Sequence, residues 1–136
     1  MYKRQDYINN DRDATDVPIY TIGSGTVVYA RTGCVSSSQF ASNTLQRECG
    51  AGWGNHLVIQ HSRSVFSRYA HLRTDGVLKA VGEQVEKNEI IGIMGNSGRS
   101  DMRHLHLEIG KSVTPFRSCA SSQSFESVTD PRRFGL

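Results

Sequence analysis

Two histidines and a glutamate alternate along one strand-like segment in the last third of the chain. The segment reads His104-Leu-His106-Leu-Glu108-Ile. Because side chains of a strand point alternately to opposite faces, His104, His106 and Glu108 share one face and the leucines face a core. Neighbouring positions on one face lie about 6–7 Å apart. One imidazole can therefore bind a metal ion while the other moves protons beside it, and the pattern predicts a functional site.

Three further histidines lie earlier in the chain. His71 ends a strand-like run that includes Tyr69. His56 and His61 flank the apolar run LVIQ and would face opposite sides of a regular strand, so we expect ordinary strand-end or surface histidines there. The turn GNSG at 95–98 lacks the Lys-Ser/Thr of a phosphate-binding loop. We therefore interpret it as a tight turn that leads into the strand with the paired histidines.

Short β-strands must position these side chains. From Val17 onward the chain contains apolar runs rich in Val, Ile and Tyr, separated by turn formers: VPIYTI, GTVVYA, NHLVIQH, VFSRYAHL, GVLKAV, EIIGIMG and HLHLEI. No window of a dozen residues has a helical apolar stripe with a cap and a stop. The pattern predicts an all-β fold, an antiparallel β-sandwich or partly open barrel, in a single domain over residues 1–136. The Ser-rich segments 35–53 and 112–127 are expected to be surface loops.

Length and composition exclude several classes of protein. The 136 residues suffice for one domain, and 37% hydrophobic residues can form its core. No stretch approaches the roughly 20 apolar residues of a membrane-spanning helix, and collagen-like, coiled-coil and disordered classes do not fit. The net charge of +3 is mild. The sequence has no stripe of Lys and Arg interleaved with aromatic residues, so it does not predict nucleic-acid binding. The polar first sixteen residues show no signal peptide, so we expect that an exported form has lost one.

The cysteines allow one disulfide bond. Cys34 and Cys49 bracket a small, polar segment that is typical of a loop, and a bridge there would be worth about 3 kcal/mol. Such a bridge would imply an oxidising compartment. The alternative is that these two residues and Cys119 are reduced and have no role.

The order of the motifs resembles a known family. WGNHLVIQH, SRYAHL, VGEQVEKNEIIGIMGNSGRS and HLHLEIG follow one another as in the M23 peptidases, the lysostaphin-type or LytM-type zinc endopeptidases of peptidoglycan. Upstream, DVPIYTIGSGTVVYA is similar to the segment that follows the first metal motif of that family. The closing DPRRFGL also resembles the end of the domain.

The resemblance implies a substrate groove and a Zn²⁺ ion bound by the His and Asp of an HxxxD motif and by the second His of HxH. Carried onto this chain, His106 is a metal ligand, and His71 and His104 are the catalytic histidines beside it. Residues 1–16 correspond to the first metal motif, with Asp6 as its aspartate.

The resemblance also suggests which residues surround the metal. It implies that Asn55 lies near the groove, and Tyr69 is a candidate for the groove wall. Glu108 could orient an imidazole from behind.

The sequence departs from the family at one ligand. Tyr2 stands four residues before Asp6, where the family has its first histidine. Three explanations are open: a degenerate site, a natural histidine that lies further upstream, or a substitute ligand such as Tyr2, Asp11 or Asp13. Zinc accepts carboxylates readily and tyrosinate rarely.

The resemblance implies a zinc metalloendopeptidase that cleaves peptide crosslinks or bridges of bacterial peptidoglycan, outside the cytoplasm in the periplasm, at the cell wall or after secretion. A monomer is expected. The alternative on the same fold is a non-catalytic domain that binds cell wall or regulates a partner.

A carrier domain of the biotinyl or lipoyl type is a second alternative, because VGEQVEKNEIIGIMG has a similar rhythm of glycine and valine. Neither Lys79 nor Lys87 lies in a recognisable acceptor motif, and the paired histidines would have no role in a carrier.

Overall fold

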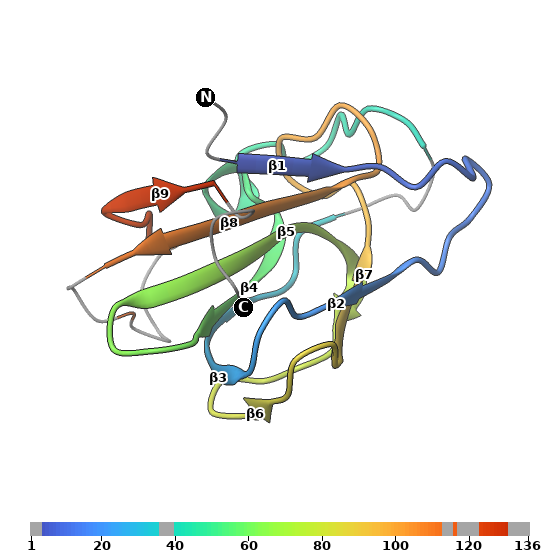
Figure 1. Cartoon of the computed structure of the whole chain (residues 1–136). Coiled ribbons are helices and arrows are strands. Elements are labelled where there is room, and N and C mark those ends of the chain that lie inside the picture. The colour runs from blue at the N-terminus through green and yellow to red at the C-terminus, as the bar shows by residue number, and fades with distance from the viewer. Residues whose placement is uncertain (1–3, 36–39, 113–115, 117–122, 131–136) are drawn as a thin grey trace.

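A computed structural model describes residues 4–35, 40–112, 116 and 123–130 (Figure 1). Its elements are β1 (Arg4–Tyr7), β2 (Pro18–Tyr20), β3 (Gly25–Arg31), the short 3-10 turn η1 (Cys49–Gly52), β4 (Asn55–Gln60), β5 (Val65–Val77), β6 (Gln84–Val85), β7 (Ile90–Met94), β8 (Leu105–Lys111) and β9 (Ser127–Thr129). Six strands follow one another in the sheet in the order β1-β8-β5-β4-β3-β6, while β7 pairs with β5 and β2, and β9 pairs with β8. All of the pairings are antiparallel. The predicted all-β antiparallel fold is confirmed.

Apolar side chains cover both faces of the central strands. On β4, Leu57 and Ile59 belong to the main core, whereas Val58 packs into a smaller cluster with Phe66 and Phe125. Alternate residues of a strand point to opposite faces, so a strand with two covered faces needs a continuous apolar run. The run LVI of β4 meets this requirement, because it supplies apolar side chains to both faces of the sheet.

Strand β5 is the longest element and connects the two parts of the sheet. Its first half pairs with β4 on one side and with β8 on the other, and its second half pairs with β7 (Figure 1). The register with β7 shifts between Leu72 and Val77, where the strand changes partner. The histidine site lies at this change of partner.

A disulfide joins the two ends of the segment that precedes β4. Cys34 is bonded to Cys49, and the bond spans 15 positions. In the described part of segment 35–53, η1 is the single regular element. The bond holds η1 beside the start of β4, and Cys119 lies outside the described residues.

The second expected loop, 112–127, is described only in part, and its last residue already belongs to β9. The described residues include no helix that is long and apolar enough to cross a membrane.

Candidate metal and catalytic site

The strand register brings an aspartate from the start of the chain to the paired histidines. Asp6 of β1 lies opposite His106 of β8, and His106 lies opposite Ala70 of β5. Because the side chain of Ala70 is small, it leaves space on this face of the sheet for the larger side chain of His106. The two strand pairings thus place a carboxylate and an imidazole side by side, 100 positions apart in the sequence.

His106 lies between two carboxylates. Its Nδ1 is 2.9 Å from Oδ1 of Asp6, and its Nε2 is 2.9 Å from Oε1 of Glu108. The Asp6 side chain is 61% exposed and Glu108 is 1% exposed, so one carboxylate opens to solvent and the other is sealed behind the ring. The predicted shared face of His106 and Glu108 is confirmed by this contact.

The backbone at His71 leaves the regular strand conformation. Its φ is +61°, in the left-handed region that residues other than glycine seldom adopt. The backbone is held there by two hydrogen bonds: the N–H of His71 donates to the carbonyl of Trp53 (2.8 Å), and the N–H of Gly95 donates to the carbonyl of His71 (3.0 Å). The bend turns the ring toward β8, and its centroid lies 4.8 Å from that of His104 and 5.8 Å from that of His106.

Backbone carbonyls determine which ring nitrogens of the two flanking histidines carry hydrogen. Nδ1 of His71 donates to the carbonyl of Ser97 (2.7 Å), and Nδ1 of His104 donates to the carbonyl of Met102 (2.7 Å). A carbonyl can only accept, so each neutral ring keeps its lone pair on Nε2. Both Nε2 atoms are therefore ready to accept a proton or to bind a metal.

The turn that supplies the Ser97 carbonyl packs tightly against the start of β4. A Cβ on Gly98 would lie 2.3 Å from the backbone nitrogen of Gly54, and a Cβ on Gly54 would lie 2.4 Å from the carbonyl carbon of Ser97. Both glycines also have positive φ, +74° at Gly98 and +67° at Gly54. Only glycine meets both conditions without strain, so the turn predicted at 95–98 also positions the partner of His71.

Burial and neighbouring charge move two histidine pKa values in opposite directions. Burial, followed by repulsion from His104, lowers the pKa of His71 to about 4, although the Ser97 carbonyl opposes the shift. Burial also disfavours protonation of His106, but the hydrogen bond and charge of Glu108, followed by those of Asp6, outweigh it and raise the pKa. At neutral pH the ring of His71 is therefore unprotonated.

These side chains line one pocket of about 550 Å³. The segment from η1 to Trp53 forms one wall, the loop before β8 forms another, and β1 and the residue after it close a third side. The lining residues are Asp6, Ile8, Ala51, Gly52, Trp53, His71, Arg99, Asp101, Met102, His104 and His106.

The donor atoms in this pocket suit a zinc ion. One ring nitrogen from each of His71, His104 and His106 lies within 4.8 Å of the others, and Nε2 of His104 is 3.8 Å from Oδ1 of Asp6. Ligand atoms at about 2.0–2.1 Å from a tetrahedral zinc are about 3.3 Å apart, so small side-chain movements suffice to bind one. Imidazole and carboxylate are both zinc ligands.

Two residues expected at the groove lie in the interior instead. Tyr69 is fully buried in the main core, because it pairs with Leu107 on the face of β5 opposite to the site, and its hydroxyl contacts Ser67 and Thr21. Asn55 is also fully buried, and its amide exchanges hydrogen bonds of 2.9 Å with the backbone of Cys34. Asn55 therefore anchors the disulfide-linked segment, and neither residue is among those that line the pocket.

The other two histidines differ from each other. His61 lies next to the end of β4, as expected, and contacts the carbonyl of Ser24 and the hydroxyl of Ser67. His56 is not a surface residue: it is fully buried, stacked on Tyr29 and edge-on to Trp53. Burial, followed by the charge of Arg68, lowers the pKa of His56 to about 3.

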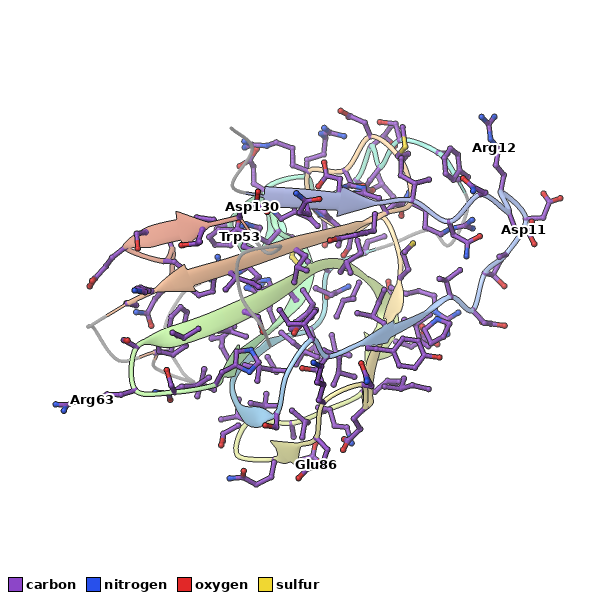
Figure 2. All side chains as sticks on the ribbon, viewed as in Figure 1. Asp11, Arg12, Trp53, Arg63, Glu86 and Asp130 are labelled. Atoms are coloured by element: carbon purple, nitrogen blue, oxygen red, sulfur yellow. A yellow bond between two sulfur atoms is a disulfide. The ribbon has the colours of Figure 1, made fainter. Side chains whose placement is uncertain are left out.

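The possible substitutes for the first histidine ligand have different positions. Asp11 and Asp13 are exposed, lie on the long connection from β1 to β2 and do not line the pocket; Figure 2 shows Asp11 at its outer turn. Their carboxylates therefore lie outside the pocket and are not in position to bind a metal ion there. Tyr2 lies outside the described residues.

Sequence reasoning missed Trp53 and the role of Ser97. Trp53 lines the pocket and its carbonyl holds the backbone of His71, while Ser97 orients the ring of the same histidine. Both contacts use backbone carbonyls, which every residue has, so no side-chain pattern marks them. The single tryptophan of the chain, beside the glycines of AGWG, was the available signal.

Comparison with known proteins identifies the family of this chain. The family model described as "Peptidase family M23" matches residues 11–118. Peptidoglycan DD-endopeptidase ShyA of Vibrio cholerae is 35% identical over 92 residues, which are 68% of this chain and 17% of ShyA. Lipoprotein NlpD of Yersinia enterocolitica is 36% identical over 103 residues, which are 74% of this chain and 87% of NlpD. The chain thus spans less than a fifth of ShyA, but most of the NlpD sequence.

Solved structures share the fold. A zinc-containing peptidase from Vibrio cholerae has a TM-score of 0.59 at 26% identity, over 83% of this chain and 28% of that one. The catalytic domain of lysostaphin from Staphylococcus simulans has a TM-score of 0.60 at 22% identity, over 97% of this chain and 77% of that one. With the family model matching most of the chain and two relatives more than one third identical, this chain belongs to peptidase family M23.

Proposed function

We propose that the protein is a zinc metalloendopeptidase that cleaves peptide crosslinks or bridges of peptidoglycan. The observation that carries the proposal is the meeting of Asp6, His71, His104 and His106 in one pocket. Asp6 and His106 are the proposed zinc ligands, and His71 and His104 are the catalytic histidines. Asp6 lies outside residues 11–118, so its assignment depends on its contact with His106.

Zinc bound there would polarise the peptide carbonyl of the substrate and lower the pKa of a water molecule toward neutrality. The protein's own residues then manage the protons. His71 and His104 each present a bare Nε2 to the pocket, so one accepts a proton from water and the other serves the developing oxyanion or the leaving amine. The carbonyls of Ser97 and Met102 keep both rings in the required tautomer.

The proposed substrate and location follow from the relatives. ShyA is named a peptidoglycan DD-endopeptidase, and NlpD is named a lipoprotein. Peptidoglycan peptides are therefore the proposed partner, and the periplasm, cell wall or exterior is the proposed place of action. The Cys34–Cys49 disulfide supports this location, because disulfides persist in oxidising compartments.

Two measurements test the proposal together. Protein purified without chelator should contain close to one zinc per chain by elemental analysis, and it should release soluble peptides from isolated peptidoglycan. Removal of the metal by a chelator should stop the release, and added zinc should restore it. Zinc binding without release from walls of several crosslink types would contradict the proposed activity.

The non-catalytic alternative is favoured by Tyr2, at the position of the first family ligand. It requires binding to isolated walls with neither tight zinc nor cleavage. Tyr2→His distinguishes the two readings of this position: if the position faces the metal, zinc affinity rises. If affinity is unchanged, the first ligand comes from elsewhere.

A further inference from the structure

One buried arginine contacts both sides of the histidine site. Arg68 of β5 is fully buried and lies opposite Glu108 of β8 in the strand register. Its Nη1 is 3.5 Å from Oε2 of Glu108, whose other oxygen is 2.9 Å from Nε2 of His106. Its guanidinium carbon also lies 3.5 Å from the ring centre of Trp53, which lines the pocket (Figure 2 labels Trp53).

We propose that the Arg68–Glu108 pair is a positioning device that determines which nitrogen of His106 faces the metal. The inference rests on the proposed zinc site and deepens it. A carboxylate can only accept a hydrogen bond, so an ionised Glu108 requires hydrogen on Nε2 of His106. The lone pair of the ring must then lie on Nδ1, the nitrogen that is 2.9 Å from Asp6.

Arg68 is the residue that permits this arrangement. Glu108 is 1% exposed, and an ionised carboxylate without water is stable only beside an opposite charge. Arg68 supplies that charge, and the rings of Trp53 and Phe125 cover its guanidinium at 3.5 and 4.8 Å. The burial of Glu108 itself keeps solvent donors away from its carboxylate.

Trp53 connects this device with His71. The carbonyl of Trp53 accepts from the N–H of His71, so the residue stacked on Arg68 also supports the bent backbone of His71. Arg68 thus contacts a residue behind His106 and a residue behind His71. It touches neither substrate nor metal and acts through its neighbours.

The test uses double variants, because removal of one member alone would take the ion-pair partner from a buried charge. Arg68→Met/Glu108→Leu replaces the pair with apolar groups of similar size, which is often neutral for stability, but deletes the acceptor. Arg68→Met/Glu108→Gln keeps an acceptor oxygen. We expect zinc affinity, measured by competition with a chromogenic chelator, to fall about 10- to 100-fold in the Leu variant and to be largely retained in the Gln variant. Phe66→Leu, a substitution in the same apolar cluster that leaves Arg68, Glu108 and both covering rings in place, is the matched control and should bind zinc like the parent.

A second readout needs no metal. In nitrogen-15 NMR of metal-free protein, the Nε2–H of His106 should give a downfield, slowly exchanging signal in the parent and the Gln variant, and none in the Leu variant. Equal zinc affinity in the Leu variant and the parent, or equal loss in both double variants with native melting temperatures, would overturn the inference. If the parent binds no zinc, the proposed function fails, and the NMR signal alone decides the role of Glu108.

Discussion

Asp6 and His106 meet across the β1–β8 pairing with 2.9 Å between Oδ1 and Nδ1. Two strands whose contacting residues are 100 positions apart in the sequence thus form the centre of the site. His71 and His104 approach this centre from β5 and from the start of β8, each with its Nδ1 already occupied. The arrangement separates residues that would bind zinc from residues that would move protons.

Loss of the central ligand should remove both zinc and activity. In His106→Ala, Asp6 keeps no strand neighbour that binds metal, so we expect zinc content near zero and no release of peptides from peptidoglycan. His61→Ala, which changes a histidine bound to Ser24 and Ser67 outside the pocket, is the control and should keep its zinc. Full activity of His106→Ala would refute the metal assignment.

Substitution of either flanking histidine should slow the reaction and leave the zinc in place. A general acid or base contributes about 10²- to 10⁴-fold, so His71→Ala and His104→Ala are expected to lose rate in that range. Elemental analysis of the same preparations measures their zinc content, which should equal that of the parent. Nε2 of His104 is 3.8 Å from Oδ1 of Asp6. If His104→Ala lost its zinc, this result would show that His104 is a zinc ligand.

Acid should destabilise the fold through His56. Its pKa is about 3 in the folded protein against 6.5 for an ordinary histidine, so the unfolded chain binds the proton first as the pH falls. The stabilising effect of the neutral ring is complete above pH 6.5 and disappears between pH 6.5 and about 3. At about 1.4 kcal/mol for each pH unit, the loss approaches 5 kcal/mol.

Urea unfolding of metal-free protein at pH 7, 5 and 4 measures this loss. His56→Phe keeps an aromatic ring against Tyr29 and Trp53 but cannot be protonated. Its free energy of unfolding should therefore fall less steeply with pH. Parallel pH profiles for the two proteins would show that other groups cause the acid sensitivity.

Removal of the disulfide should weaken the fold and the pocket wall together. Cys34→Ser/Cys49→Ser opens a 15-residue span, which should lower the free energy of unfolding by about 3 kcal/mol. The segment from η1 to Trp53 lines the pocket, so zinc-loaded protein should also show a higher KM for peptidoglycan fragments. Chemical denaturation and cleavage kinetics provide the two measurements, and an unchanged midpoint would contradict the stabilising role of the bond.

Local periodicity was enough to predict β2, β3, β4, β5, β7 and β8 and one face of the site, but not β1, β6 or β9. Side chains alternate between the two faces of any β-strand, so the spacing of His104, His106 and Glu108 was enough to place them on one face. The contact of His106 with Glu108 agrees with this spacing. The Cys34–Cys49 bond joins the pair that brackets a polar loop. These features depend on residues that are near one another in sequence.

Long-range register and burial decided the rest. Tyr69 faces the core because it lies opposite Leu107, and Asn55 is sealed by the segment of Cys34, so neither forms a groove wall. His71 is oriented by a φ of +61° and a backbone carbonyl, neither of which a side-chain pattern reveals.

The sequence by itself determined which residue types alternate on each strand, because that periodicity is local. Only the tertiary structure decided which strands meet. The contact of Asp6 with His106, and that of Arg68 with Glu108, depends on register between distant strands, and packing of the whole core selects that register.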